Sequence, residues 1–466
     1  MLTAHTVAQI RAAEETAGAA VGFDALMQQA AAGLAERLLE LIPAGEAVVV
    51  LVGPGNNGGD ALFAAAALCQ VGRRVNLCLL DPAAVHLAGL EAAVASGAKV
   101  VDSPAGHRFV VDALFGIGGH VGLTGKAADW ANWVEADRPL VVAVDVPSGI
   151  GVDDGTLSGP AIRADHTVTF ATRKYGLLVG PAAAFAGEVS LVDIGLDFAG
   201  EPALTALEAG DVANFKDRLV PTSESHKYTR GIVGISAGSA AYPGAAHLCV
   251  AGAQAGPAGM VRFAGEQQLA MRVIDRAPEV VAATGRADCW VVGPGGDDSA
   301  APLQAALATG SPIVVDASAL AHLPGPFETD ALLTPHAGEL ARLLAVTSGQ
   351  VAADPLRFAR EAAQKFSATV LLKGARTIIA APDGRVAVNI SGTSWLATAG
   401  AGDVLAGLAG SLLAAGLTAF EAGSLAALLH GLAAEEIGGP FVASELAVAA
   451  SDSFAGFVMN DGSDGR

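Results

Sequence analysis

The chain has 466 residues, of which 47 are acidic and 27 are Lys or Arg, so its formal net charge is −20, and 52% of its residues are hydrophobic. This apolar content excludes a disordered chain, and the length exceeds what one hydrophobic core usually supports, so we expect two or three domains. The acidic balance argues against nucleic acid as the main partner, because a phosphate backbone binds a basic face.

In chain order, short runs of Val, Ile and Leu alternate with Ala-rich stretches through the first half. Continuous apolar runs are typical of strands buried on both faces, so they predict a mainly parallel sheet covered by helices. The predicted strands are 47–52, 74–80, 109–112, 139–145, 166–170 and 188–193. The predicted helices are 24–41, 60–71, 85–96 and 126–135.

From residue 198 to 224 the strand signals stop and charges rise, which predicts a domain junction, so we expect domains at 1–210 and 211–466. A second α/β series follows. Its predicted strands are 232–236, 260–263, 289–292, 312–316, 331–334, 369–372, 377–381 and 385–389. Its predicted helices are 245–255, 302–309, 337–345, 355–367, 402–415 and 419–437.

The most apolar stretch, 396–417, contains Asp403 and several glycines, so it predicts a buried, tightly packed helix rather than a membrane span. The first 28 residues carry Arg11 and Glu14 and have no apolar centre, so they predict neither a signal peptide nor an anchor. The four cysteines are scattered without a C-x-x-C motif, which fits a reducing compartment. We therefore expect a cytoplasmic protein with no membrane partner.

A glycine-rich loop follows the first predicted strand, in the sequence V-G-P-G-N-N-G-G-D that ends at Asp60. Glycines between a strand and a helix let backbone N–H groups approach a pyrophosphate. The alternative is a tight turn in which Asp60 caps the helix. Asn56 and Asn57 are unusual in a plain dinucleotide loop, and their carbonyl oxygens suit a ligand or a hard cation.

Two more predicted strands end in polar residues, with Asp112 before a glycine-rich stretch and Asp145 before V-P-S-G. In a doubly wound sheet, ligands bind beyond the carboxyl ends of the strands. One Asp at such an end is often only a cap, but three such ends in one domain favour a binding site.

The motifs N-N-G-G-D at 56–60, D-A-L-F-G-I-G at 112–118 and D-V-P-S-G at 145–149 resemble the NAD(P)HX epimerase domain of the YjeF N-terminal family. Residues 9–14 and the sequence K-Y-G-L that begins at Lys174 fit the same family, and the resemblance covers about residues 1–200. It implies a Rossmann-like three-layer domain. It also implies that the substrate is hydrated NADH or NADPH (NADHX or NADPHX), in which water has added at ring carbon 6, and that the enzyme interconverts the two epimers.

The resemblance also implies site residues. Potassium would bind Asn57, Asp112 and Ser148. Asp145 would contact the substrate, and we take it as the candidate catalytic acid/base. The other substrate contacts would be Asn56, Asn57, Gly58, Gly59, Asp60, Gly116, Ile117, Gly118, Gly119, His120, Val121 and Gly122.

In the second half, the sequence G-T-S-W-L-A-T-A-G-A-G-D ends at Asp403 and opens a long predicted helix. Small residues there let backbone N–H groups hold an anion at the positive end of the helix. A carboxylate at that place can accept a hydroxyl proton while the oxygen attacks phosphorus. The alternative is that Gly402 and Asp403 only cap the helix. The chain has no P-loop lysine motif, so a ribokinase-like scheme is favoured.

Polar residues follow other strands of this half. His336 follows the strand at 331–334, where a lone histidine is more often a cap or a core residue, and Lys373 and Arg376 lie in a strand turn where they could neutralise phosphates or be solvated. The sequence G-I-S-A-G at 234–238 fits the nucleophile elbow of α/β-hydrolases, but that interpretation leaves residues 373–377 and 400–403 unexplained.

Together these motifs resemble the ADP- or ATP-dependent NAD(P)HX dehydratase domain, a ribokinase-like α/β fold, over about residues 220–455. The resemblance implies phosphorylation of the ring hydroxyl and elimination of phosphate, with Asp403 as the base. Hydrated NAD(P)H would contact Ala245 or its neighbour Ala246, Gly295, His336 and Asp403. The nucleotide would contact Lys373, Gly374, Ala375, Arg376, Thr377 and Gly402. Ser318, Gly296 and Asp297 depart from the family's usual residues.

A stereospecific dehydratase uses only one epimer, so an epimerase on the same chain would make the whole pool repairable. We expect Mg²⁺ with ADP or ATP in the second domain and K⁺ in the first. The alternatives are a small-alcohol kinase fused to a ligand-binding domain, a first domain that only senses nucleotides, and a plain NAD dehydrogenase. We expect a homo-oligomer, although crowded Gly and Ala helices would also fit a monomer core.

Overall fold

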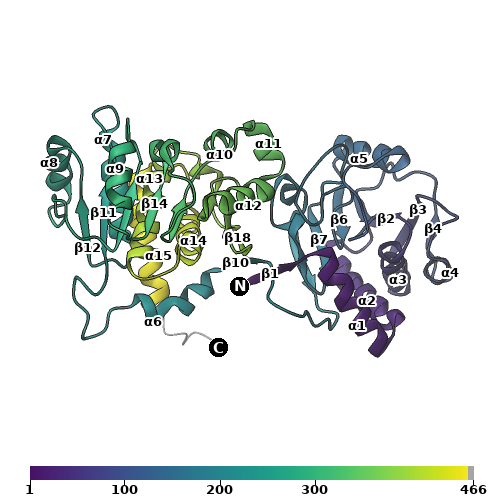
Figure 1. Cartoon of the computed structure of the whole chain (residues 1–466). Helices are drawn as coiled ribbons and strands as arrows, with labels where there is room; N and C mark the ends of the chain where they lie inside the picture. The colour runs from purple at the N-terminus through teal and green to yellow at the C-terminus, as the bar shows by residue number, and fades with distance from the viewer. Residues whose placement is uncertain (460–466) are drawn as a thin grey trace. The chain divides into compact units, whose positions relative to one another are not determined.

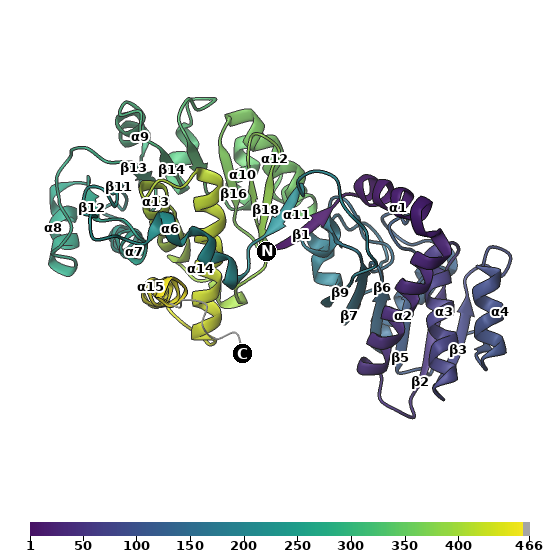
Figure 2. The same ribbon diagram turned by 90° about the horizontal axis from the view of Figure 1, so that it is seen from below.

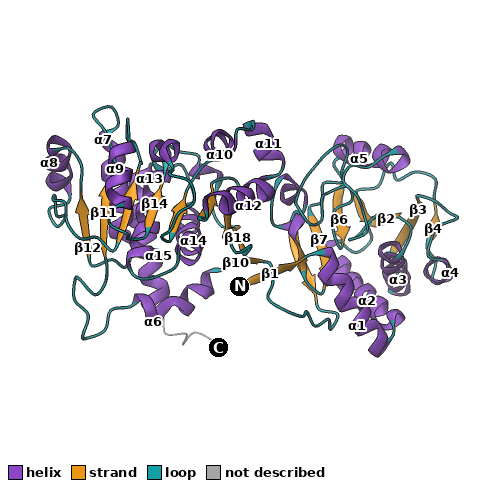
Figure 3. Ribbon diagram, in the orientation of Figure 1, coloured by secondary structure: helices purple, strands orange, loops and turns teal. Residues whose placement is uncertain are grey.

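The computed structural model describes residues 1–459, with side chains up to residue 456. The chain divides into two compact units, one formed by Thr3–Leu204 and the other by the chain from Thr205 onward together with Met1–Leu2. Each unit is a layered α/β body in which helices cover both faces of a sheet (Figures 1 and 3). The predicted fold class is therefore confirmed.

The sheet of the first unit is entirely parallel, as predicted, in the order β4-β3-β2-β5-β6-β7-β9. Helices α2, α3 and α4 pack on one face and α5 on the other. The strands are β2 (Ala47–Val52), β3 (Arg74–Leu79), β4 (Lys99–Val100), β5 (Phe109–Ala113), β6 (Leu140–Val144), β7 (His166–Phe170) and β9 (Glu188–Val192). The helices are α1 (Val7–Val21), α2 (Phe23–Leu41), α3 (Asn56–Gln70), α4 (Leu87–Ala95) and α5 (Gly125–Asp137).

The strand order reverses between β2 and β5: the chain adds β3 and β4 on one side of β2 and then returns to add β5 on the other side. The connections after β2 and β5 therefore lie on opposite faces of the sheet and leave a crevice between them. Gly53 directly follows β2, at a point where a Cβ would lie 1.7 Å from the carbonyl oxygen of Leu114, so only glycine fits there. This is the topological switch point at which doubly wound sheets bind ligands.

The structure also contains elements that the sequence did not predict. Besides α1 and β4, these include β1 (Leu2–His5), which pairs in parallel with β8 (Arg173–Lys174). Helix α3 begins at Asn56, four residues before the predicted start. Gly58 and Gly59 weaken the helix signal because glycine has low helix propensity. Gly58 is nevertheless required in this first turn, since a Cβ there would lie 2.2 Å from the carbonyl oxygen of Gly53.

The second unit has six parallel strands, β12-β11-β13-β14-β15-β16, extended by the antiparallel strands β17 and β18. All eight were predicted, with shifts of one residue at some ends. Their bounds are β11 (Ile232–Ser236), β12 (Met260–Phe263), β13 (Cys289–Val292), β14 (Ile313–Val315), β15 (Ala331–Leu333), β16 (Thr369–Leu372), β17 (Thr377–Ala380) and β18 (Val386–Asn389).

Two groups of helices cover this sheet. The first group packs on one face around a large apolar core, and the second lies on the other face (Figure 2). The first group is α7 (Pro243–Ala255), α8 (Gln267–Arg276), α13 (Ala401–Ala414), α14 (Ala419–Ile437) and α15 (Ala443–Met459). The second is α9 (Ala300–Leu307), α10 (Ala337–Leu344) and α12 (Pro355–Phe366). The helices α6 (Lys216–Leu219), α8, α11 (Ser348–Ala353) and α15 were not predicted.

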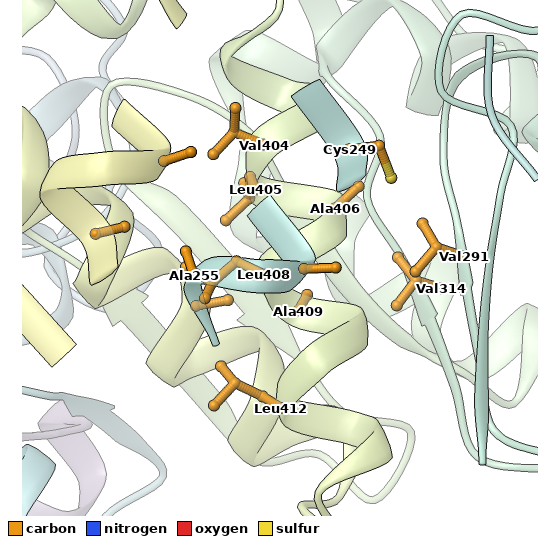
Figure 4. Close-up of a cluster of buried hydrophobic side chains, with 14 of the residues drawn as sticks. Cys249, Ala255, Val291, Val314, Val404, Leu405, Ala406, Leu408, Ala409 and Leu412 are labelled. Atoms are coloured by element: carbon orange, nitrogen blue, oxygen red, sulfur yellow. The ribbon is translucent and has the colours of Figure 1, made fainter. Parts of the chain in front are cut away.

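Helices α7 and α13 cross with their backbones in contact (Figure 4). A Cβ on Gly407 would lie 2.0 Å from the carbonyl oxygen of Cys249, and a Cβ on Gly252 would lie 2.1 Å from that of Val404. The apolar Gly/Ala stretch is therefore a core helix, as predicted. Among residues 1–459, no helix has the length and apolar character needed to cross a membrane.

Candidate active sites

A cavity of about 850 Å³ opens at the switch point of the first unit. Four strand ends supply its floor, since the segments after β2, β5, β6 and β7 all line it. Helices α1 and α2, which the sequence analysis had not connected to the site, contribute residues that include Arg11, Glu14 and Met27. The cavity therefore forms where the topology predicts a ligand, and the N-terminal helices form part of its wall.

Most of the expected substrate contacts lie at this cavity: Asn56, Asn57, Asp60, Gly116, Ile117, Gly118, Gly119 and Asp145 all line it. Gly58 and Gly59 are buried in the first turn of α3 behind it. His120, Val121 and Gly122 are not part of its lining. Gly122 faces the backbone instead, where a Cβ would lie 2.2 Å from the carbonyl oxygen of Ser158.

Asp145 is the polar centre of the cavity. It is 7% exposed and forms an ion pair with the buried ammonium of Lys174. The Lys174 Nζ also donates to the Thr169 hydroxyl and to the carbonyl oxygen of Phe170, both at 2.9 Å. Lys174 was not among the predicted site residues, because nothing in the spacing of K-Y-G-L shows that its ammonium reaches the end of β6.

Two residues at this ion pair have an unfavourable backbone conformation. Asp145 has a φ of 68° and Ala171 has a φ of 61°, in the left-handed region that non-glycine residues rarely adopt. Both residues directly follow neighbouring strands and both line the cavity. Strain of this kind persists where the surrounding structure imposes it, and it is concentrated at functional sites.

Two further carboxyl groups share the cavity with Asp145. Burial raises the pKa of Asp60 well above its usual value, and the charges of Asp145 and Glu14 raise it further. Burial and the charge of Asp145 also raise the pKa of Glu14. The cavity thus holds an aspartate paired with a lysine beside a carboxyl group whose pKa is raised. That is the arrangement from which proton donation and proton acceptance can both proceed.

Asp112, in β5, and Ser148, in the segment after β6, contact each other and are not part of the lining of this cavity. Asp112 is fully buried and accepts hydrogen bonds from the Ser148 backbone N–H at 2.8 Å and from the Ser148 hydroxyl at 2.7 Å. Burial raises the pKa of Asp112 to about 6, against the opposing effect of these hydrogen bonds. Asn57 lies at the start of α3, and a Cβ on Gly116 would lie 3.0 Å from its Oδ1. The Nδ2 of Asn57 is buried and has no hydrogen-bond partner among residues 1–459.

The second candidate site lies at the carboxyl ends of β11, β13, β14, β15 and β16, again around a switch point, between β11 and β13. Helix α13 begins here, with Gly400 as its left-handed N-cap at a φ of 91° and Asp403 in its first turn. Gly400 has no side chain and so makes no side-chain capping hydrogen bond. Burial and the charge of Asp316 raise the pKa of Asp403 to about 6, and Lys373 acts in the opposite direction.

Lys373 is placed by the end of β14. Its Nζ donates to Asp316 Oδ1 at 2.8 Å, and a Cβ on Gly402 would lie 3.4 Å from the same Nζ. The ammonium therefore lies against the first turn of α13. Burial acts to lower the pKa of Lys373, but the charge and hydrogen bond of Asp316 together with the charges of Glu339 and Asp403 outweigh it, so the pKa is raised.

The other predicted nucleotide contacts lie in the turn between β16 and β17. This turn includes Gly374 and Ala375, and Thr377 begins β17. Thr377 Oγ1 donates to the carbonyl oxygen of Gly374 at 3.4 Å. Arg376 donates to the carbonyl oxygen of Ile390 at 2.8 Å, and burial lowers its pKa. Arg376 is thus tied to the segment that leads into residues 392–403.

His336 caps helix α10. Its Nδ1 accepts from the backbone N–H of Gly338 at 3.0 Å and of Glu339 at 3.3 Å, and its side chain remains 55% exposed. The capping interpretation of this histidine is therefore seen directly, and the exposed ring edge leaves room for a ligand contact as well.

Ala245 and Gly295 meet across the site. Gly295 has a φ of 61°, and a Cβ on it would lie 2.3 Å from the Cβ of Ala245 in the first turn of α7. Ser318, which stands where the resembled family often has Asp, contacts the Ser299 hydroxyl at 2.6 Å and donates to the carbonyl oxygen of Gly293 at 3.0 Å. It therefore fixes the loop that carries Gly295.

Comparison with known proteins adds three observations. Residues 23–176 match the family described as YjeF-related protein N-terminus, and residues 233–453 match the family described as NAD(P)H-hydrate dehydratase. The chain is 43% identical over 451 residues, covering 92% of this chain and 93% of its relative, to the bifunctional NAD(P)H-hydrate repair enzyme Nnr of Mycobacterium leprae. It is 44% identical over 439 residues, 90% of each chain, to the protein of the same name from Mycobacterium tuberculosis strain CDC 1551 / Oshkosh.

Among solved structures, the ADP/ATP-dependent NAD(P)H-hydrate dehydratase of Bacillus subtilis, co-crystallised with ATP and Mg²⁺, is 27% identical with a TM-score of 0.50. The match covers 54% of this chain and 98% of that one. A ribokinase-like superfamily protein from Enterococcus faecalis shares the fold at 21% identity and a TM-score of 0.50, over 57% of this chain and 100% of that one.

Proposed function

The chain belongs to the family of bifunctional NAD(P)H-hydrate repair enzymes, and from this premise we propose how its two sites divide the work. The enzyme is both an NAD(P)H-hydrate epimerase, in the first unit, and an ADP/ATP-dependent NAD(P)H-hydrate dehydratase, in the second. It epimerises hydrated NAD(P)H and dehydrates the S form back to NAD(P)H. We assign the epimerase to residues 1–210 and the dehydratase to residues 211–466. The observation that carries this division is that each unit has its own site at a switch point.

In the first unit, Asp145 acts as the acid/base of epimerisation. Exchange at ring carbon 6 requires a proton on the departing hydroxyl, and then loss of a proton from the water that adds to the opposite face of the ring. Asp145 lies in the cavity with its charge held by Lys174, and Asp60 and Glu14 lie close enough to interact with it electrostatically. Residues 56–60 and 116–119 form the wall against which the nucleotide binds.

Potassium fits the donor set of Asn57, Asp112 and Ser148, because all three side chains offer oxygen atoms. In addition, within the described part of the chain, the buried Asp112 carboxylate is held by hydrogen bonds and not by an ion pair. When bound, the ion would supply positive charge beside the substrate's phosphates. The protein's part is to hold the three oxygens, with Ser148 fixing the orientation of Asp112.

In the second unit, Asp403 is the base of the dehydratase. It accepts the proton of the ring hydroxyl as that oxygen attacks the terminal phosphorus of ATP or ADP, the bond from that phosphorus to the bridging oxygen breaks, and ADP or AMP leaves; the backbone N–H groups of the first turn of α13 would face the phosphoryl group. The phosphate then leaves ring carbon 6, and loss of a proton from carbon 5 restores the double bond of NAD(P)H. The nucleotide enters as its Mg²⁺ complex, as the B. subtilis relative supports.

Ligand contacts in this unit follow the same division. Hydrated NAD(P)H binds Ala245, Gly295, His336 and Asp403, and the nucleotide binds Gly402 together with the turn that runs from Lys373 to Thr377. The contact between Gly295 and Ala245, and the position of the Lys373 ammonium against Gly402, support this assignment.

We also propose that the enzyme is cytoplasmic and forms homo-oligomers. Its four free cysteines, of which Cys78, Cys249 and Cys289 are buried, support a reducing compartment.

The test is recovery of absorbance at 340 nm from a mixed-epimer preparation of NADHX with Mg²⁺ and ADP or ATP. Recovery beyond the share of the competent epimer, above the slow spontaneous exchange in an enzyme-free control, is expected. Recovery that stops at that share would remove the epimerase. Release of ADP from ATP with a stable phosphorylated product would favour the kinase alternative.

A further inference from the structure

Asp316 is a buried carboxylate at the dehydratase site to which the proposed mechanism gives no role. It directly follows β14 and is 2% exposed. Its Oδ1 accepts two hydrogen bonds of 2.8 Å, one from the Thr334 hydroxyl and one from the Lys373 ammonium. Its backbone N–H donates to the carbonyl oxygen of Val292 at 3.0 Å, so the carboxylate is fixed to the sheet.

The ion pair sets the position of a long and otherwise flexible side chain. A lysine has several rotatable bonds, and its ammonium can occupy many positions in front of a binding site. Here the Asp316 carboxylate holds the Lys373 Nζ where it faces Gly402 in the first turn of α13. Positive charge at this end of a helix adds to the partial charge of its N–H groups, so the pair prepares the place that a phosphoryl group occupies.

Asp403 lies within the field of the same pair. The charged and titratable groups that interact with it or with the pair are Asp316, Lys373, Glu339 on α10, Cys249 on α7 and His430 on α14. After burial, the charge of Asp316 makes the largest contribution to the raised pKa of Asp403, and it exceeds the opposing contribution of Lys373. The carboxylate that orients the lysine therefore also makes the catalytic carboxylate more basic.

We propose that Asp316 is the positioning residue of the dehydratase site: its carboxylate fixes the Lys373 ammonium against the first turn of α13 and supplies negative charge beside Asp403. This role rests on the proposed function of Asp403 as the base. It differs from a purely structural role, because the charge of Asp316 acts on two partners that belong to different steps, nucleotide binding and proton transfer.

The test compares Asp316→Asn with Thr334→Val. Thr334→Val removes a hydrogen bond to Oδ1 and keeps the charge, whereas Asp316→Asn keeps an accepting oxygen and removes the charge. For Asp316→Asn we expect the KM for MgATP to rise by about tenfold, because the hydrogen bond that holds Lys373 is no longer charge-assisted on the acceptor side. We also expect the acidic limb of the kcat profile to move to lower pH. For Thr334→Val, that limb should stay in place.

Epimerisation by the same full-length chain, followed without nucleotide as exchange between the two NADHX epimers, is the control for folding. It should be unchanged in both variants. If the wild-type protein does not dehydrate NADHX, the proposed function fails. If wild type is active and Asp316→Asn keeps both the KM and the pH profile, only the positioning role is overturned.

A second variant covers the case in which the lone Lys373 charge prevents folding. The double variant Asp316→Asn/Lys373→Gln removes both charges, so no unpaired charge remains in the site. Because the effect of Asp316 on Asp403 exceeds that of Lys373, the acidic limb of this variant should still lie below that of wild type. An acidic limb at the wild-type position would overturn the proposal.

Discussion

The Nε2 of His430 lies 3.0 Å from the carbonyl oxygen of Ala401, the residue at which helix α13 begins. A carbonyl oxygen can only accept, so Nε2 carries the hydrogen. Burial lowers the pKa of His430 to about 4, with the charge of Lys373 acting in the same direction and the hydrogen bond to Ala401 opposing. The neutral ring thus supports the first turn of the helix that carries Asp403.

This histidine predicts a loss of stability in mild acid. Its pKa is about 6.5 when unfolded and about 4 when folded, so between these values the unfolded chain binds more protons and stability falls as the pH falls. The expected loss between pH 7 and pH 5 is about 2 kcal/mol. Hydrogen exchange of the α13 and α14 amides would measure it, with His430→Gln lacking this component at each pH. Equal pH dependence in both proteins would contradict the prediction.

The ion pair in the first unit predicts which residues epimerisation needs. Asp145→Asn should lower the epimerisation rate by at least about a hundredfold, as expected when a general acid/base is lost. Lys174→Met should lower it to a similar extent, because Asp145 then lies buried without its cation. Exchange between NADHX epimers is the measurement, and dehydration of the S form is the control for folding. Full exchange by Asp145→Asn would end its assignment as the acid/base.

A matched pair of glycines tests the wall of the same cavity. In Gly116→Ala, the new Cβ would lie 3.0 Å from Asn57 Oδ1 and 3.2 Å from Asp145 Oδ2, so we expect a clear loss of epimerisation. In Gly118→Ala, the Cβ would have only Arg11 Nη2 nearby, at 3.9 Å, so the loss should be smaller than in Gly116→Ala. Equal effects of the two substitutions on the exchange rate would show that Gly116 has no special position.

Potassium dependence should be confined to the epimerase. Replacing K⁺ by choline should slow epimer exchange and lower the thermal midpoint of the first unit, because binding to the folded state stabilises it. Dehydration of the S form should be unaffected. Ser148→Ala removes one oxygen and one of the hydrogen bonds that orient the Asp112 carboxylate, so it should raise the K⁺ concentration needed for half-maximal exchange. If exchange were equally fast in choline, the three oxygens would not form a potassium site.

A second glycine pair tests the dehydratase. Gly295→Ala would place a Cβ 2.3 Å from that of Ala245 at a φ of 61°, so both space and backbone conformation oppose it. We expect dehydration to fall by at least about tenfold, since such a clash moves the loop by a large part of an ångström. Gly244→Ala, where a Cβ would meet nothing within 4 Å, is the control. Steady-state rates at 340 nm distinguish the two variants.

Much of the fold could be predicted from the sequence, because the buried strands are continuous apolar runs bounded by glycine and polar residues. The runs at β2, β7, β11, β12, β13 and β16 have the predicted bounds. The short edge strand β4 has two residues, Lys99 and Val100, and both are exposed, so it gives no such signal. Helix α8 was missed although it is strongly amphipathic, since its polar residues Gln267, Gln268 and Arg272 conceal the apolar positions.

The candidate sites were predicted in part for a related reason. Asp112 and Asp145 lie at strand ends, and Asp403 lies at a helix start. Each strand or helix is recognisable in the sequence, so the position of these residues at a site follows from the topology. The roles of Lys174 and Asp316 become visible only when side chains from different strands meet, since the partners of the two ion pairs are 29 and 57 positions apart in the sequence. The spacing of residues along the sequence does not predict such contacts.

The crossing of α7 and α13 limits how this enzyme can evolve. Both helices begin at the dehydratase site, and their backbones touch at Gly252 and Gly407, where even one methyl group would force them apart. Substitutions at these two glycines would displace both helix starts, so larger residues are not expected at the crossing. A change in nucleotide preference is therefore expected in the turn between β16 and β17, which carries proposed nucleotide contacts and takes no part in this crossing.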